Sequence, residues 1–260
     1  MADYKVYVDQ QTGIERIEYF DEHWYKIGDV WLPSVSKVIN DIITKGYGYD
    51  KWLKDTGNEA GYVLREAQAS GSSLHHAIEA LIKGGLINAE YEQGSYTKKE
   101  WQKLNNWYNW YNNFDFEPIA TELIVYDIDL GVAGTMDFVV KKDDEIWIMD
   151  WKTGNNIYDT SELQLAAYAS MYNKSHEEKI TRAGIIHVGA LNKTFKDMNG
   201  PGIKCQEINI EDLTLQFKKT LDLFKWRFPN AKAPIVEFPL SLKLDKGLLK
   251  ATDSPQSVAT

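Results

Sequence analysis

The sequence predicts an α/β fold, in which a mixed β-sheet core is flanked by helices and carries an N-terminal β-hairpin and helical region. From residue 120 onward the hydrophobic pattern gives the order β-β-β-α-β-α, whereas residues 34–113 hold three segments of helical period. The 260 residues, 43% of them hydrophobic, suffice for one large domain or two small ones. We expect one domain over residues 1–230 with its core at 71–190, then a partly disordered extension at 231–260.

The N-terminal region begins with strands. Residues 4–8 alternate in polarity, and residues 23–32 form a second β-rich pair around a Gly28-Asp29 turn. Pro33-Ser34 then begins a helix, because Ser34 is a good N-cap and apolar residues follow it at helical spacing.

Two further helices precede the main sheet. Gly71-Ser72 begins a helix at residues 71–83, which carries a buried stripe and ends at Gly84-Gly85. A second helix, near 97–113, carries five aromatic residues, namely Trp101, Trp107, Tyr108, Trp110 and Tyr111. These rings could stack on unpaired bases, but their helical spacing favours core or helix packing for most of them.

The remaining chain alternates strands and helices. The pattern predicts strands at 122–126, 131–140 and 145–152, a helix at 160–172, a strand at 183–188 and a helix at 211–227. Asp143-Asp144 supplies a hairpin turn between the second and third strands. Ser161 and Gln164 have the spacing of a capping box, which predicts a helix start there.

Composition restricts the partners. The net charge of -9 means that bulk charge does not draw the chain to nucleic acid, so local basic residues and bound cations would have to offset phosphates. The single cysteine, Cys205, excludes a disulfide framework and metal sites built on several cysteines. No apolar run approaches the ~20 residues that span a bilayer, and the N-terminus lacks a signal pattern. We expect a soluble, cytoplasmic protein with no membrane partner.

Candidate chemistry concentrates in Gly-Thr-Met-Asp at 134–137 and in the strand that ends Asp150-Trp151-Lys152. Because side chains alternate along a strand, Asp150 and Lys152 share one face, and Asp137 lies in the preceding strand of the same hairpin. Such hard oxygen ligands suit Mg²⁺ or Mn²⁺, which can lower the pKa of a water and stabilise charge on a phosphate. The Asp-x-Lys triplet alone is a weak signal, since acid-x-Lys occurs twice elsewhere, and a solvated strand end is the favoured interpretation of the triplet by itself.

Together these motifs resemble the RecB-type branch of the PD-(D/E)XK nuclease superfamily, close to the mitochondrial genome maintenance exonuclease and related phage nucleases. The resemblance covers about residues 30–190 and is strongest at 131–168. It implies a restriction-endonuclease-like fold and a metal-dependent DNA nuclease, and it favours an exonuclease that acts on DNA ends or single strands in replication, recombination or repair. The alternatives are a structure-specific endonuclease and a catalytically silent nucleic-acid-binding module. A phage origin would place the protein in the host cytoplasm.

The resemblance also implies roles for the acidic strands. Asp137 and Asp150 match the metal ligands of the family, and the backbone carbonyl of Trp151 would also face the metal. Lys152 matches the catalytic lysine. We expect Mg²⁺ or Mn²⁺ as the cofactor and DNA as the substrate.

Other matches lie outside these strands. Gln164 and Tyr168 match the Gln-x-x-x-Tyr helix motif, and Glu122 matches an acidic residue on the first strand, although a surface charge explains Glu122 equally well. His75, in Gly-Ser-Ser-Leu-His, matches a metal-binding histidine of the family. A shift of one residue would assign that role to His76 instead, and an ordinary helical histidine with a satisfied hydrogen bond is the structural alternative.

Overall fold

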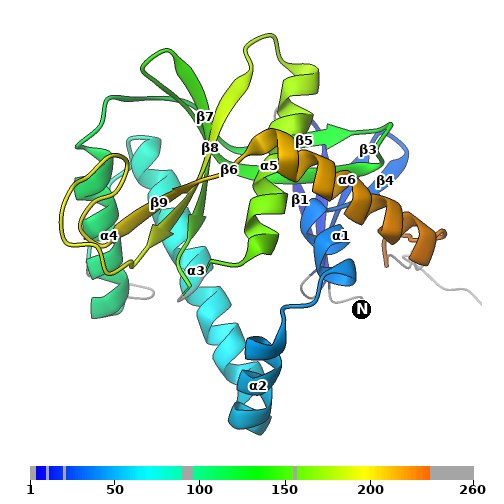
Figure 1. Cartoon of the computed structure of the whole chain (residues 1–260), viewed down its shortest axis with the longest axis horizontal. Coiled ribbons are helices and arrows are strands. Elements are labelled where there is room, and N and C mark those ends of the chain that lie inside the picture. The colour runs from blue at the N-terminus through cyan, green and yellow to red at the C-terminus, as the bar shows by residue number, and fades with distance from the viewer. Residues whose placement is uncertain (1–3, 10–11, 20–21, 90–95, 155–156, 235–260) are drawn as a thin grey trace, which may run out of the picture.

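The structure is a computed structural model that describes residues 4–9, 12–19, 22–89, 96–154 and 157–234 (Figure 1). The disorder predicted within 231–260 falls mostly on residues 235–260, which lie outside the described residues. Among the described residues, no helix is both long enough and apolar enough to cross a membrane.

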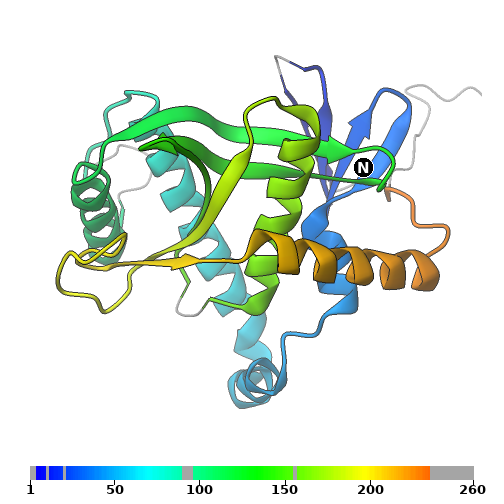
Figure 2. The same ribbon diagram turned by 45° about the horizontal axis from the view of Figure 1, so that its top comes forward.

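Four antiparallel strands form the N-terminal sheet in the order β1-β2-β3-β4. They are β1 (Tyr4–Val8), β2 (Glu15–Tyr19), β3 (Glu22–Ile27) and β4 (Val30–Pro33). The predicted strands and the turn at Gly28-Asp29 are confirmed, whereas β2 was not predicted. This sheet packs against the start of β6 (Val132–Lys142) (Figure 2). Ser34 forms a backbone bridge with Ala133 there. A small apolar cluster at this contact includes Tyr25 and Leu32.

The main sheet has five strands in the order β5-β6-β7-β8-β9. Besides β6, they are β5 (Phe116–Asp127), β7 (Glu145–Lys152), β8 (Ile180–Val188) and β9 (Ile203–Glu207). Only β7 and β8 pair in parallel, so the sheet is mixed, and the predicted fold class is confirmed. Sequence patterning missed the edge strand β9.

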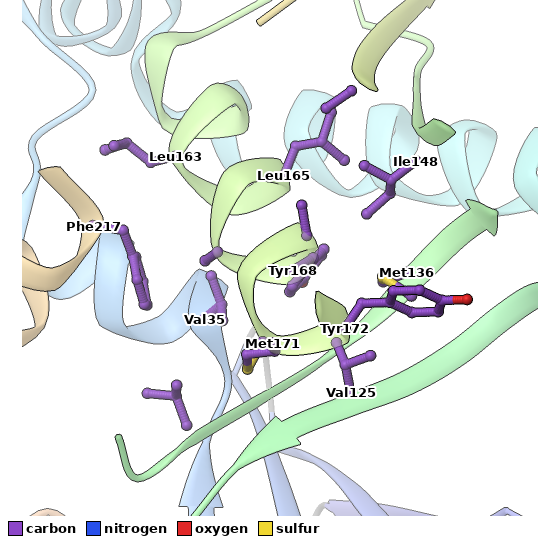
Figure 3. Close-up of a cluster of buried hydrophobic side chains, with 14 of the residues drawn as sticks. Val35, Val125, Met136, Ile148, Leu163, Leu165, Tyr168, Met171, Tyr172 and Phe217 are labelled. Atoms are coloured by element: carbon purple, nitrogen blue, oxygen red, sulfur yellow. The ribbon is translucent and has the colours of Figure 1, made fainter. Parts of the chain in front are cut away.

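Helices cover both faces of this sheet. They are α1 (Val35–Ile42), α2 (Tyr47–Thr56), α3 (Ala60–Ile82), α4 (Lys98–Tyr111), α5 (Asp159–Ser175) and α6 (Ile210–Arg227), with a 3₁₀ turn at Gly57–Glu59. Residues of α3 and α4 share one apolar cluster with the sheet, and residues of α1, α5 and α6 share the other. Figure 3 shows α5 at the centre of the cluster that it shares with α1 and α6, with Tyr168 and Met171 among the side chains of that cluster.

The beginnings of two helices differ from the prediction. Helix α3 begins at Ala60 rather than at Gly71, and α2 together with the first half of α3 extends away from the sheets (Figures 1 and 2). Gly71 therefore lies within the helix rather than at its start. The helix comes close to Thr153 at this point, since a Cβ atom on Gly71 would lie 3.3 Å from Thr153 Oγ1. The predicted capping box at Ser161 is also wrong, because α5 begins at Asp159 and Ser161 is buried within its first turn.

Most of the aromatic residues of α4 pack as expected. Trp107 and Trp110 are buried and meet Trp151 of β7 edge to face, at ring-centroid distances of 5.7 and 6.3 Å. Tyr108 is exposed. The N-cap predicted at Ser34 is confirmed, because its hydroxyl accepts a hydrogen bond from the backbone N–H of Lys37.

Candidate active site

Three carboxylates fall in one row across three neighbouring strands. Thr121 pairs with Phe138 and Leu123 with Met136, so Glu122 of β5 lies opposite Asp137 of β6. The last registered pair of β6 and β7 is Phe138 with Met149, and the next residues of the two strands are Asp137 and Asp150. The sheet register therefore brings the acids of both motifs, and Glu122, to one level.

The backbone pairing of β6 and β7 ends at this row, where the Asp137 side chain accepts the hydrogen bond of a β7 backbone N–H group. Its Oδ2 atom accepts a hydrogen bond of 2.9 Å from the backbone N–H of Trp151. The same oxygen lies 3.4 Å from Nδ1 of His75. His75 belongs to α3, which packs on one face of the sheet. His76, one position later, is exposed. The helix thus turns His75, and not its neighbour, toward the acids.

Asp150 is almost completely buried, at 4% exposure. The Lys152 ammonium lies 2.7 Å from its Oδ2 atom, but without the angles of a hydrogen bond, so within the described part of the chain this buried oxygen has an ionic contact and no hydrogen bond. A buried carboxylate oxygen normally has such a donor, and leaving one without it is costly. The Lys152 ammonium thus supplies the positive charge at this oxygen, and a metal ion would share Asp150 with it or displace it.

The acids repel one another in this arrangement. Burial, together with the charges of Asp137 and Glu79, raises the pKa of the Glu122 carboxyl to about 8. Burial also raises the pKa of Asp150, against the lowering effect of Lys152. Burial alone would lower the pKa of Lys152, but the charges of Asp150 and Asp137 outweigh it and raise that pKa. Lys152 accordingly remains an ammonium at neutral pH.

The helix motif lies against the first of the two strand motifs. Gln164 donates a 2.8 Å hydrogen bond from Nε2 to the Tyr168 hydroxyl. The Tyr168 ring covers the backbone of Gly134, where an added Cβ atom would lie 2.2 Å from the ring. The glycine of Gly-x-x-Asp therefore makes room for the tyrosine of Gln-x-x-x-Tyr, so the two motifs are in direct contact.

Some neighbours of the site were not predicted from the sequence. Tyr25 of β3 hydrogen bonds with Thr135 at 2.9 Å, and Arg16 of β2 lowers the pKa of Glu122. Both come from strands more than 100 residues away along the chain, and no local pattern marks them. Glu122 itself has φ = 51°, an unusual conformation for a non-glycine residue, and sites of such strain cluster at functional positions.

The donor set suits a hard divalent cation, since it combines carboxylates with an imidazole and includes a buried oxygen that lacks a hydrogen bond. Within the described ranges, no three His, Cys, Asp or Glu side chains already converge as a metal cluster. A cation would therefore take its donors from groups that are now paired with other residues, Asp137 with His75 and Asp150 with Lys152.

The fold and this arrangement define a class of nuclease in which strand-borne acids and a lysine meet at the end of a hairpin. A family model of the PD-(D/E)XK nuclease superfamily matches residues 53–231. The chain belongs to this superfamily. A search of curated proteins found no match to it.

Proposed function

We propose that the protein is a divalent-metal-dependent deoxyribonuclease, and that it acts as an exonuclease on DNA ends or single strands. The observation that carries the proposal is the row formed by the part-buried Asp137 and the buried Asp150, with the Lys152 ammonium beside them. This row supports the finer resemblance to the RecB-type and phage nucleases, with a role in replication, recombination or repair in the cytoplasm. A structure-specific endonuclease remains the second candidate, since the same residues serve either mode of attack.

The metal would be Mg²⁺ or Mn²⁺, with Asp137, Asp150, His75 and the backbone carbonyl of Trp151 as its ligands. When bound, the ion would supply an acidified water and positive charge for the phosphate. His75 brings nitrogen to an otherwise oxygen-based set, which favours Mn²⁺ relative to Mg²⁺.

The other side chains would bind and orient the substrate. Lys152 is an ammonium, so it acts as a hydrogen-bond donor and a charge that stabilises the negative oxygens of the attacked phosphate, rather than as a base. Gln164 is partly exposed and would contact the substrate, while the buried Tyr168 fixes the amide orientation of Gln164 through their hydrogen bond. Burial and the neighbouring acids favour the protonated form of Glu122, and a cation that enters the row would favour its carboxylate form.

The test is cleavage of end-labelled single- and double-stranded DNA in Mg²⁺, in Mn²⁺ and in EDTA. We expect cleavage with either metal and none in EDTA. Lys152→Ala should lower the rate by at least ~10²-fold. Lys142→Ala, at the opposite end of the sheet, is the matched control and should leave the rate unchanged. Full activity in a folded Lys152→Ala variant, or cleavage in EDTA, would contradict the proposal.

A further inference from the structure

A groove beside the acidic row has no part in the function proposed so far. It lies between the N-terminal sheet, strand β5 and the end of α3, and consists of two adjoining hollows of about 510 and 180 Å³. Both hollows are lined by Asp9, Glu122 and Ile124. Because Glu122 lies opposite Asp137, the groove reaches the candidate active site directly.

Arg16 lines the smaller hollow together with Tyr7 and Thr135. Its guanidinium contacts Glu18 at 3.0 Å and lies over the Tyr7 ring, 4.9 Å from the centroid. The buried Nε atom of Arg16 finds no hydrogen-bond acceptor among the residues that the structure describes. Since that Nε atom is buried, a phosphate in the hollow would meet the terminal nitrogens of the guanidinium, a group that binds phosphates through paired hydrogen bonds.

The larger hollow carries a second cation. Lys83, at the end of α3, contacts Glu79 through an ammonium on a side chain that is 60% exposed. Such an exposed pair contributes little stability and can exchange partners. Of the two acids that line both hollows, Asp9 accepts hydrogen bonds from Thr12. Glu122 lines the smaller hollow together with Arg16.

We propose that this groove holds the unpaired DNA strand that adjoins the attacked phosphate. Arg16 and Lys83 bind backbone phosphates, and the half-exposed Tyr7 offers a ring on which a base stacks. This inference rests on the proposed nuclease function and assigns the path of its substrate. In a chain of net charge -9, such local cations must supply the attraction that bulk charge does not.

The N-terminal sheet offers its own control. Arg16 and Tyr25 are directly opposed on one face of β2 and β3, so the next residue, Lys26, lies on the other face. Arg16→Gln and Lys26→Gln remove the same charge from the same sheet. Lys83→Gln tests the groove from a surface helix position, where a folding defect is not expected.

The measurement is fluorescence anisotropy of an end-labelled oligothymidylate in EDTA, titrated at several salt concentrations. We expect Arg16→Gln to raise Kd about tenfold, as for one lost charged contact, and to reduce the salt slope by about 0.7. Lys83→Gln should weaken binding in the same direction, and Lys26→Gln should bind like the wild type. A folded Arg16→Gln variant with wild-type affinity, or equal weakening by Arg16→Gln and Lys26→Gln, would overturn the inference, as would binding of duplex alone.

This outcome is separable from that of the nuclease proposal, since binding in EDTA requires no cleavage. Binding that depends on Arg16 without cleavage in any metal would refute the nuclease function and leave the groove as a DNA site. Metal-dependent cleavage that Arg16→Gln leaves unchanged in KM and kcat would refute the groove and leave the nuclease function.

Discussion

Glu122→Gln should stabilise the metal-free protein, and by an amount that grows with pH. Burial of Glu122 and the charges of Asp137 and Glu79 raise the pKa of its carboxyl from 4.5 to about 8 in the folded state. The unfolded chain ionises this carboxyl near the ordinary value, so between these two pH values the folded state holds a proton that the unfolded state has released. Stability from this group is thus full below about pH 4.5 and is lost as pH rises to about 8.

The expected magnitude follows from the two pKa values. A tenfold change in proton affinity corresponds to ~1.4 kcal/mol, so the full difference corresponds to roughly 5 kcal/mol, and relaxation around the ionised group reduces it to about 2–4 kcal/mol. For a domain of this size, ~2–4 °C of Tm accompanies each kcal/mol. Glu122→Gln should therefore melt within a degree or two of the wild type near pH 4.5 and roughly 5–15 °C above it near pH 9.

The assay is thermal and urea unfolding in EDTA across this pH range, followed by tryptophan fluorescence. Glu117→Gln, an exposed carboxyl on the same strand, is the matched control and should show no such trend. Saturating Mn²⁺ should narrow this difference, because a cation bound at Asp137 and Asp150 stabilises the ionised Glu122 of the wild type and meets one carboxylate fewer in the variant. Parallel stability curves for the wild type and Glu122→Gln would refute the electrostatic account of the row.

Three further predictions concern the metal, the motif contact and the mode of attack. Asp137→Asn and Asp150→Asn should each weaken Mn²⁺ binding in calorimetry by at least about tenfold, and unchanged heats in both would contradict the site. Gly134→Ala should lose at least ~1–3 kcal/mol in urea unfolding because its Cβ atom would overlap the Tyr168 ring, and wild-type stability would refute that contact. A covalently closed single-stranded circle should resist the enzyme while its linear form is degraded, whereas equal degradation would favour the endonuclease.

The strands that carry the acids could be predicted because their signal is local. The strand at residues 145–152 has an apolar run from Ile146 to Met149, after which Asp150 and Lys152 follow, and alternation alone places these two side chains on one face. In β6 the Gly-x-x-Asp motif of Gly134 and Asp137 is also a local pattern. Their partners across the sheet follow from hairpin pairing, which is also a short-range feature.

The missed elements lack that signal for identifiable physical reasons. No residue of α2 is buried, and the first half of α3 is largely exposed, so neither segment shows an apolar stripe. Strand β9 lies at the edge of the sheet, and only Ile203 of its five residues is buried. Arg16 and Tyr25 contact the site because the N-terminal sheet packs on the main sheet. No local sequence pattern predicts that packing.

His75 and His76 provide the sharpest test of the metal site, because they are adjacent and chemically identical. The structure turns His75 to within 3.4 Å of Asp137 and leaves His76 exposed on the same helix. His75→Ala should therefore lower cleavage at least ~10²-fold and shift the balance of Mn²⁺ and Mg²⁺ activity, while His76→Ala should change the rate less than about twofold.

A purely structural His75 would behave differently from a metal ligand. Its removal would lower the metal-free Tm and leave the Mn²⁺ affinity of the folded protein unchanged, since only the contact with Asp137 would be lost. A ligand has the opposite signature, in which the metal-free Tm barely moves and the Tm increase on adding Mn²⁺ shrinks. Measuring both Tm values for both variants decides between these roles without reference to activity, and a Mn²⁺ response lost in His76→Ala alone would show that the wrong histidine had been assigned.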